Sequence, residues 1–192
     1  MDAKKITEIL NNDGVIAFVT DTVWGIGCLP TSKKAVERIY EIKHRDTKKP
    51  LILMSDSDKY LRKYVKPLSI LANELIQKHF PGALTLVVNK SDNTPDYITS
   101  GLETVGIRVP NNKTFAQICN LIDGHVLATT SANLSNEPAA LTYEEAVKYI
   151  GNKVDLVVED YGEKAQGRAS TVAGISPKGI QIFRQGDVIL DF

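Results

Sequence analysis

The 192-residue sequence has little of what marks several specialised classes of protein. It contains two cysteines, Cys28 and Cys119, which lie far apart and form no C-x-x-C motif. This argues against a disulfide-stabilised secreted domain and against a thiolate metal site. Its longest apolar stretches, such as 15–19 and 84–88, are far shorter than the roughly 18 residues of a transmembrane helix.

The sequence also has no net charge, because 23 basic residues balance 23 acidic ones. Bulk electrostatics therefore offers no general attraction to nucleic acid or to anionic lipid, and a polyanionic ligand must be held by a local patch. The first residues include an early acid, Asp2, and no apolar segment of a signal peptide. We therefore expect a soluble protein of the cytoplasm, without a membrane partner.

Several catalytic motifs are missing as well. There is no phosphate-binding G-x-x-x-x-G-K-[ST] loop, no G-x-S-x-G elbow and no H-E-x-x-H, and the three histidines are isolated. The segment 25–30 begins like a dinucleotide fingerprint, but Pro30 stands where the third glycine would be. Metalloenzyme and hydrolase chemistry are therefore disfavoured.

What is present is an alternation of helical and strand-like segments, with 43% hydrophobic and 24% charged residues. Apolar periodicity predicts helices over 6–10, 35–42, 60–64, 68–80, 115–122 and 143–150. Short apolar runs predict strands at 15–19, 51–54, 84–88, 105–109, 126–128, 156–158, 170–175 and 180–183. This alternation is typical of an α/β domain. Because the segment after 156 has strands without long helices, we expect a mixed sheet in one domain.

The densest basic cluster lies at 43–49, where four of seven residues are Lys or Arg between an expected helix and an expected strand. Converging Lys and Arg side chains can neutralise a triphosphate. The alternative is a solvated loop whose basic residues are favoured near a helix C-terminus. The segment alone favours the solvated loop.

Short polar residues follow two expected strands, and each segment has two interpretations. Hydroxyls and glycines at 20–27 suit a ligand crevice, or a turn with glycines at positive φ. Residues 129–133 suit contacts to an amino acid or nucleotide, or a cap. Arg108, inside an apolar strand, needs a structural ion-pair partner or a carboxylate ligand. The stretches around Ser170 and Arg184, taken alone, are more often structural.

Taken together, six segments in order resemble the YrdC/Sua5 family of threonylcarbamoyl-AMP synthases. The similarity extends from about residue 6 to residue 186. The matching motifs are Thr20–Gly27, Lys43-His-Arg45 with Lys49-Pro50, Phe80–Thr85, Ile107–Pro110, Ser131-Ala-Asn133, and Ser170–Val172 with Arg184–Gly186. Six weak motifs in register outweigh the structural alternative that each has alone.

The resemblance implies an α/β fold, a single YrdC-like domain over residues 1–192. Its twisted sheet would mix parallel and antiparallel strands, with flanking helices and a concave ligand cleft. The chain is similar to the short form of the family, without the extra C-terminal domain of Sua5.

The resemblance also implies the reaction. ATP, L-threonine and bicarbonate would condense to L-threonylcarbamoyladenylate with release of pyrophosphate, the first step of t6A37 modification of tRNA. ATP would be a substrate that carries Mg²⁺ on its phosphates, and no protein-bound metal cluster is implied. The resemblance also implies a transient contact with the proteins that transfer the carbamoyl group, and weak binding of tRNA.

Residue roles follow from position in the family's motifs. Lys43 and Arg45 would be catalytic, by stabilising charge on the phosphates. The implied threonine-binding residues are Thr22, Arg108, Thr129 and Ser170. The implied ATP-binding residues are Arg45, Lys49, Thr104, Ser131, Asn133, Ala139 and Arg184.

Two other functions remain as rivals. An RNA-binding module would use the concave surface, but zero net charge and 7% aromatic residues favour it little. A carbamoyl-transfer enzyme, similar to the YrdC-like domain of hydrogenase maturation proteins, normally comes with zinc-finger and acylphosphatase modules that this sequence lacks.

Overall fold

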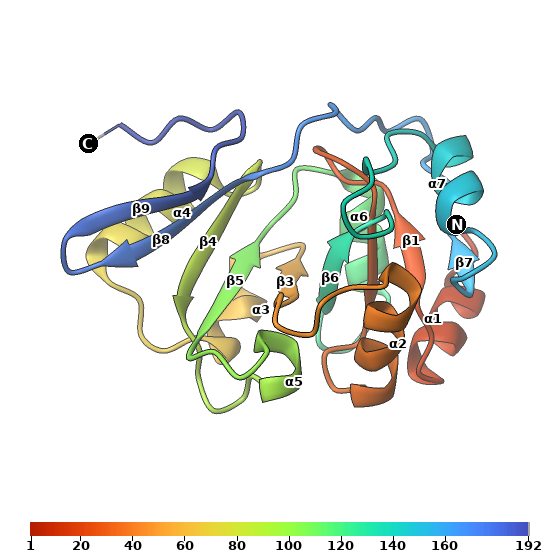
Figure 1. Ribbon diagram of the computed structural model, residues 1–192, viewed down its shortest axis with the longest axis horizontal. Coiled ribbons are helices and arrows are strands. Elements are labelled where there is room, and N and C mark those ends of the chain that lie inside the picture. The colour runs from red at the N-terminus through yellow and green to blue at the C-terminus, as the bar shows by residue number, and fades with distance from the viewer. Residues whose placement is uncertain (192) are drawn as a thin grey trace.

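A nine-stranded mixed sheet forms the centre of the protein in the computed structural model, which describes residues 1–191. The strand order is β7-β1-β2-β6-β3-β5-β4-β8-β9. The sheet crosses the whole molecule, with β7 at one end and the β8–β9 hairpin at the other (Figure 1). The strands are β1 (Ile16–Phe18), β2 (Gly25–Cys28), β3 (Ile52–Ser55), β4 (Leu84–Asn89), β5 (Thr104–Arg108), β6 (Val126–Ser131), β7 (Leu156–Val157), β8 (Thr171–Ser176) and β9 (Gly179–Arg184).

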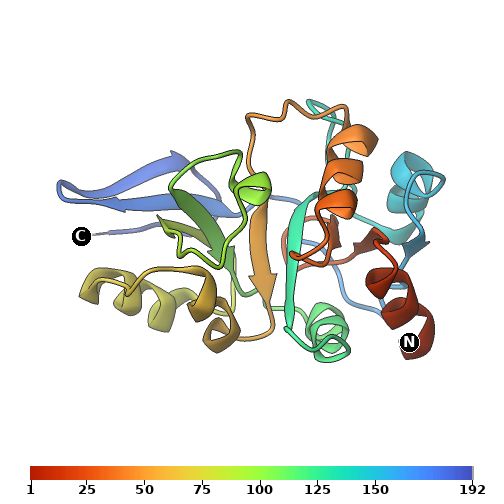
Figure 2. The ribbon, with the colours of Figure 1, turned by 90° about the horizontal axis from the view of Figure 1, so that it is seen from below.

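Helices cover both faces of this sheet (Figure 2). They are α1 (Ala3–Asn11), α2 (Lys33–Lys43), α3 (Asp58–Leu61) with a 3₁₀ turn at Arg62–Tyr64, α4 (Ile70–His79), α5 (Asp96–Thr99), α6 (Lys113–Asn120) and α7 (Tyr143–Ile150). Side-chain caps fix where several of them begin: the Ser32 hydroxyl accepts from the amide of Ala35, and the Ser69 hydroxyl accepts from the amide of Ala72. None of the helices formed by residues 1–191 is long and apolar enough to cross a membrane.

Alternation along β1 separates the core into two clusters. Val15, Ala17 and Val19 belong to the larger cluster, which includes apolar residues of α2. Ile16 and Phe18 belong to the smaller one, which includes residues of α1 and α6. Successive side chains of a strand point to opposite faces, so one short strand anchors helices on both sides.

The expected α/β fold with a mixed sheet is confirmed. β3 pairs in parallel with β5, and β4 pairs in parallel with β8, while β8 and β9 form the antiparallel pair expected in the C-terminal segment. The predicted helices and strands all form, with ends shifted by a few residues. The four-residue helix α5 was not expected.

The segment 20–27 differs from its expected form. Part of it is the strand β2, which pairs antiparallel with both β1 and β6. Gly25 and Gly27 do not have positive φ, so that explanation of the glycines is wrong. Instead, a Cβ on Gly25 would lie 2.9 Å from Cε2 of Phe18, and one on Gly27 would lie 3.0 Å from the carbonyl oxygen of Ala128. The glycines allow close packing inside a strand. Because glycine has a low strand propensity, the sequence did not predict a strand here.

Candidate functional site

A cavity of about 360 Å³ opens on the face of the sheet that carries the smaller cluster. Six strands or the loops next to them contribute to it: β2, β3, β4, β5, β6 and β8, together with the end of β9. The lining residues are Thr20, Thr22, Val23, Trp24, Gly25, Arg45, Pro50, Ile52, Met54, Thr85, Arg108, Thr129, Thr130, Ser131, Asn133, Ala139, Ala169, Ser170, Val172 and Arg184.

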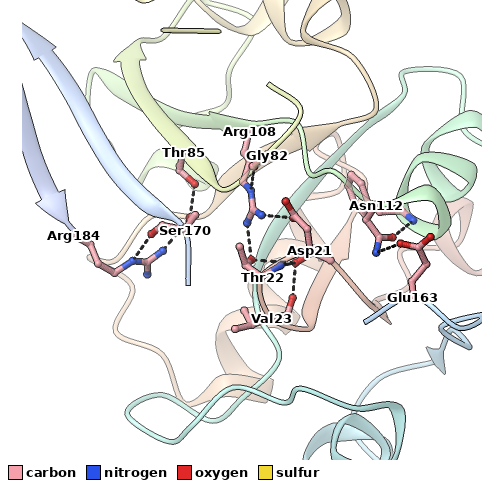
Figure 3. Close-up of polar contacts among 12 residues, drawn as sticks. Asp21, Thr22, Val23, Gly82, Thr85, Arg108, Asn112, Glu163, Ser170 and Arg184 are labelled. Atoms are coloured by element: carbon pink, nitrogen blue, oxygen red, sulfur yellow. Dashed lines mark hydrogen bonds and ion pairs between the residues drawn. The ribbon is translucent and has the colours of Figure 1, made fainter. Parts of the chain in front are cut away.

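Arg108, at the end of β5, organises one end of the cavity. Its guanidinium donates to the carbonyl oxygen of Gly82 and to the hydroxyl of Thr22, both at 2.9 Å, and forms an ion pair with Asp21 (Figure 3). The residue is 2% exposed. Burial lowers the pKa of Arg108, and the Asp21 carboxylate opposes that shift. A buried cation with this many partners is held in one orientation.

Backbone and hydroxyl hydrogen bonds fix the Asp21–Thr22 segment that faces Arg108. The Thr20 hydroxyl donates to the carbonyl oxygen of Val23 at 2.6 Å and accepts from the amide of Thr22 at 3.2 Å. The amides of Gln166 and Gly167 donate to the carbonyl oxygens of Asp21 and Thr22. The turn is therefore held from both sides before any ligand binds.

A second polar group lies next to Arg108 across β4 and β8. Arg184 donates through Nε to the carbonyl oxygen of Ser170 at 3.0 Å and through Nη2 to the Ser170 hydroxyl at 3.2 Å. The Ser170 and Thr85 hydroxyls are 2.8 Å apart (Figure 3). Desolvation lowers the pKa of Arg184. This end of the cavity offers hydroxyls and two guanidinium groups, a set suited to a small carboxylate ligand.

The basic loop after α2 forms the opposite end. The Arg45 guanidinium donates to the carbonyl oxygens of Lys49 and Pro50 at 3.2 and 3.0 Å, which turns it toward the cavity. Burial lowers the pKa of Arg45, and Tyr40 and Asp46 oppose the shift. Nearby, the Ser131 hydroxyl donates to Asn133 Oδ1 at 2.6 Å. A guanidinium beside short polar groups can bind phosphate oxygens.

The structure brings together most of the residues assigned from the sequence. Those that line the cavity are Thr22, Arg45, Arg108, Thr129, Ser131, Asn133, Ala139, Ser170 and Arg184. Lys49 does not line it, and its side chain is exposed. Thr104 shares a face of β5 with Arg108 but also does not line it. The ligand roles of these residues stay predictions.

Lys43 is placed differently from its expected position. It is 1% exposed and does not line the cavity. Its ammonium donates to the carbonyl oxygens of Ser131 and Asn133 and to Asn133 Oδ1, at 2.6, 2.7 and 2.6 Å. Burial, and then the nearby Arg45 charge, lowers the pKa of Lys43 to about 7. Because all three of its N–H groups have protein acceptors, Lys43 supports the Ser131–Asn133 turn in this structure, and its catalytic role stays a prediction.

Sequence reasoning missed three partners inside motifs that it singled out. Asp21 and Gly82 hold the Arg108 guanidinium, and Thr85 contacts Ser170. The motifs contain these residues, but no local signal shows that each one meets a partner far along the chain. Arg108 alone gave a hint, because a buried arginine needs a partner.

Comparisons with known proteins identify related sequences. A family model described as Sua5/yciO/yrdC, telomere recombination, matches residues 8–186. A protein of Vibrio cholerae named threonylcarbamoyl-AMP synthase is 34% identical over 185 residues, which are 95% of this chain and 96% of that protein.

Solved structures are similar as well. P. abyssi Sua5 complexed with L-threonine superposes with a TM-score of 0.89 at 29% identity over 97% of this chain. The present chain spans 55% of the length of that Sua5 chain. E. coli YciO, at 24% identity, a TM-score of 0.86 and coverage of 96% and 89% of the two chains, shows the same fold.

Proposed function

The chain belongs to the Sua5/YciO/YrdC family, and from this premise we propose that it is a threonylcarbamoyl-AMP synthase. It would join L-threonine, bicarbonate and ATP to give L-threonylcarbamoyladenylate, pyrophosphate and water. This product would enter the t6A modification of tRNA, after transfer by other proteins. One observation carries the proposal: a single cavity has a buried guanidinium with hydroxyls at one end and Arg45 of the basic loop at the other.

At the Arg108 end, the substrate would be the amino acid. Its carboxylate would pair with Arg108, and the hydroxyls of Thr22, Thr129 and Ser170 would bind its remaining polar groups. The related P. abyssi Sua5 forms a complex with L-threonine, which supports this choice of amino acid. The chain's own contribution would be to hold the α-amino group where the bicarbonate carbon can reach it.

At the other end, the substrate would be ATP, with Mg²⁺ carried on its phosphates. The amino nitrogen bonds to the bicarbonate carbon as water leaves. A carboxylate oxygen of this N-carboxy-threonine then attacks the α-phosphorus, and the bond to pyrophosphate breaks. No protein nucleophile is needed. Arg45 and the groups around Ser131 would stabilise charge on the phosphates.

Pyrophosphate release tests the proposal directly. Purified protein is incubated with MgATP and bicarbonate, with and without L-threonine, and L-serine serves as the control amino acid. We expect strong stimulation by threonine and little by serine. Folded protein that releases no pyrophosphate with any amino acid would contradict the proposed function. Salt-dependent RNA binding by the same inactive protein would favour the RNA-binding alternative.

A further inference from the structure

Three residues on or next to different strands form a hydrogen-bonded chain beside Arg108, in which Thr85 and Ser170 are buried and Arg184 is exposed. Thr85 lies on β4, Ser170 lies directly before β8, and Arg184 ends β9. Thr85 and Ser170 are 1% and 3% exposed, and both line the cavity. Ser170 lies between the other two side chains (Figure 3).

The hydrogen bonds in this chain restrict where the Ser170 proton can point. Arg184 can only donate, so the Ser170 hydroxyl accepts from it. Within residues 1–191 the Thr85 hydroxyl has no hydrogen-bond partner besides Ser170. Either hydroxyl can donate in this contact, and the proton of the other one is then left for a ligand in the cavity. In the arrangement considered next, Thr85 donates to Ser170.

A hydroxyl oxygen that accepts two hydrogen bonds has both lone pairs occupied. Its own proton is then confined to the remaining direction. Because Ser170 lines the cavity, a ligand there can reach its hydroxyl. Ser170 is thus prepared to donate, and its favoured ligand atom is an acceptor oxygen.

We propose that Thr85 is a positioning residue, which together with Arg184 orients the Ser170 hydroxyl as a donor to an oxygen of the amino-acid substrate. This inference rests on the proposed function for the identity of that substrate, L-threonine. Thr85 acts through Ser170, and a change at Thr85 should therefore weaken binding of the amino acid only while the Ser170 hydroxyl is present.

The test measures binding of L-threonine, with Trp24 as the probe. Trp24 is the single tryptophan of the chain and lines the cavity, so its fluorescence reports binding without turnover. Thr85→Val keeps the shape of the side chain and removes the hydroxyl. We expect it to raise the Kd for L-threonine about fivefold, the effect of one neutral hydrogen bond. Thr85→Ser, which restores the hydroxyl, should return the Kd to within about twofold of wild type.

Thr99→Val is the matched control. Thr99 is fully buried, and its hydroxyl has no hydrogen-bond partner among residues 1–191. This variant therefore removes a buried hydroxyl without removing a contact, and its Kd should equal that of wild type. Thermal unfolding of each variant shows whether it is folded.

A double-mutant cycle with Ser170→Ala decides the mechanism. If Thr85 acts through Ser170, Thr85→Val has no further effect on the Kd in the Ser170→Ala background. The same fivefold loss in that background would overturn the inference, because Thr85 would then act on the substrate directly. An unchanged Kd for Thr85→Val alone would also overturn it. Wild-type protein that binds no L-threonine would instead contradict the proposed function.

Discussion

The two ends of the cavity are built in different ways. At one end, Arg108, Thr22, Thr85 and Ser170 each have a protein hydrogen-bond partner and are each at most 3% exposed. Around the basic loop, Lys48 and Lys49 are exposed and Arg45 is partly so. One end is rigid before a ligand binds, and the other is open to solvent.

This difference matches what each end would recognise under the proposed function. A small amino acid differs from its competitors by one hydroxyl or methyl group, so discrimination requires fixed donors in a site that excludes water. A triphosphate offers many charged oxygens, and flexible cations can neutralise them without strict geometry. We therefore expect changes at the Arg108 end to affect both stability and catalysis, and changes at the basic loop to affect catalysis alone.

Arg108→Ala is the strongest test of that expectation. It should lower kcat/KM for threonine on the order of 10²–10³-fold, because a buried guanidinium is lost. It should also lower the free energy of unfolding by about 3 kcal/mol, because the Asp21 carboxylate is left without its partner. Steady-state kinetics and urea unfolding measure the two effects.

The double variant Asp21→Ala/Arg108→Ala is the control for the ion pair. It removes both charges, so most of the lost stability should return while activity stays low. A stable Arg108→Ala variant with normal kinetics would remove the contrast between the two ends.

Arg45→Ala should separate catalysis from stability. We expect kcat/KM for ATP to fall on the order of 10²-fold, since one charge-stabilising donor is lost. The midpoint of urea unfolding should stay close to that of wild type. Arg62→Ala, which removes a surface guanidinium bound to Asp58, is the control and should keep full activity. A large loss of stability in Arg45→Ala would mean that the loop is as structural as the Arg108 end.

Lys43 is buried like the residues at the Arg108 end, but it lies next to the basic loop. The pH dependence of stability tests how its burial affects the protein. The pKa of Lys43 is lowered from 10.5 to about 7 in the folded protein. Between these two values the unfolded chain holds a proton that the folded chain lacks, so stability rises with pH. Relative to Lys43→Met, the wild type should therefore gain free energy of unfolding from about pH 7 upward. Below that pH the difference should be constant.

Urea unfolding at about pH 6.5, 8 and 9.5 gives this comparison. Lys48→Met, in the exposed loop that follows α2, is the control for the substitution of a lysine by methionine. A difference between wild type and Lys43→Met that falls as pH rises would contradict the prediction.

Lys49→Ala should have the smallest effect. Its exposed side chain would attract the phosphates only weakly, because salt ions in the solvent screen the interaction. We therefore expect KM for ATP to rise about two- to fivefold at low salt. The increase should disappear at high salt. Parallel titrations with Lys48→Ala show whether the contribution belongs to Lys49 or to the charge of the whole loop. An effect that persists at high salt would indicate a buried, specific contact instead.

Much of this fold was predictable because the spacing of apolar residues follows the positions that are buried. The helix over 35–42 and the strand at 15–19 each have an apolar pattern that matches their buried positions. The strand β2 was not predicted, because its glycines allow close packing and no local sequence pattern indicates such packing. The site was predictable as a set of motifs, but the partner of each side chain was not. Asp21 and Arg108 are 87 positions apart, and Lys43 and Asn133 are 90 apart. The role of Lys43 depends on that pairing, which exists only after the strands assemble.

The position of β8 and β9 has a consequence for how the protein becomes active. Ser170 and Arg184 enter the cavity from the last strands of the chain, and Ser170 meets Thr85 of β4, which lies 85 positions earlier. Contacts of such long sequence separation form slowly, because a large loop must close first. On the ribosome, the helices and the central strands can fold while this cavity still lacks one wall. Translation therefore adds this wall after the other parts of the cavity, and a nascent chain exposes the unpaired backbone N–H and C=O groups at one edge of β4 until β8 arrives.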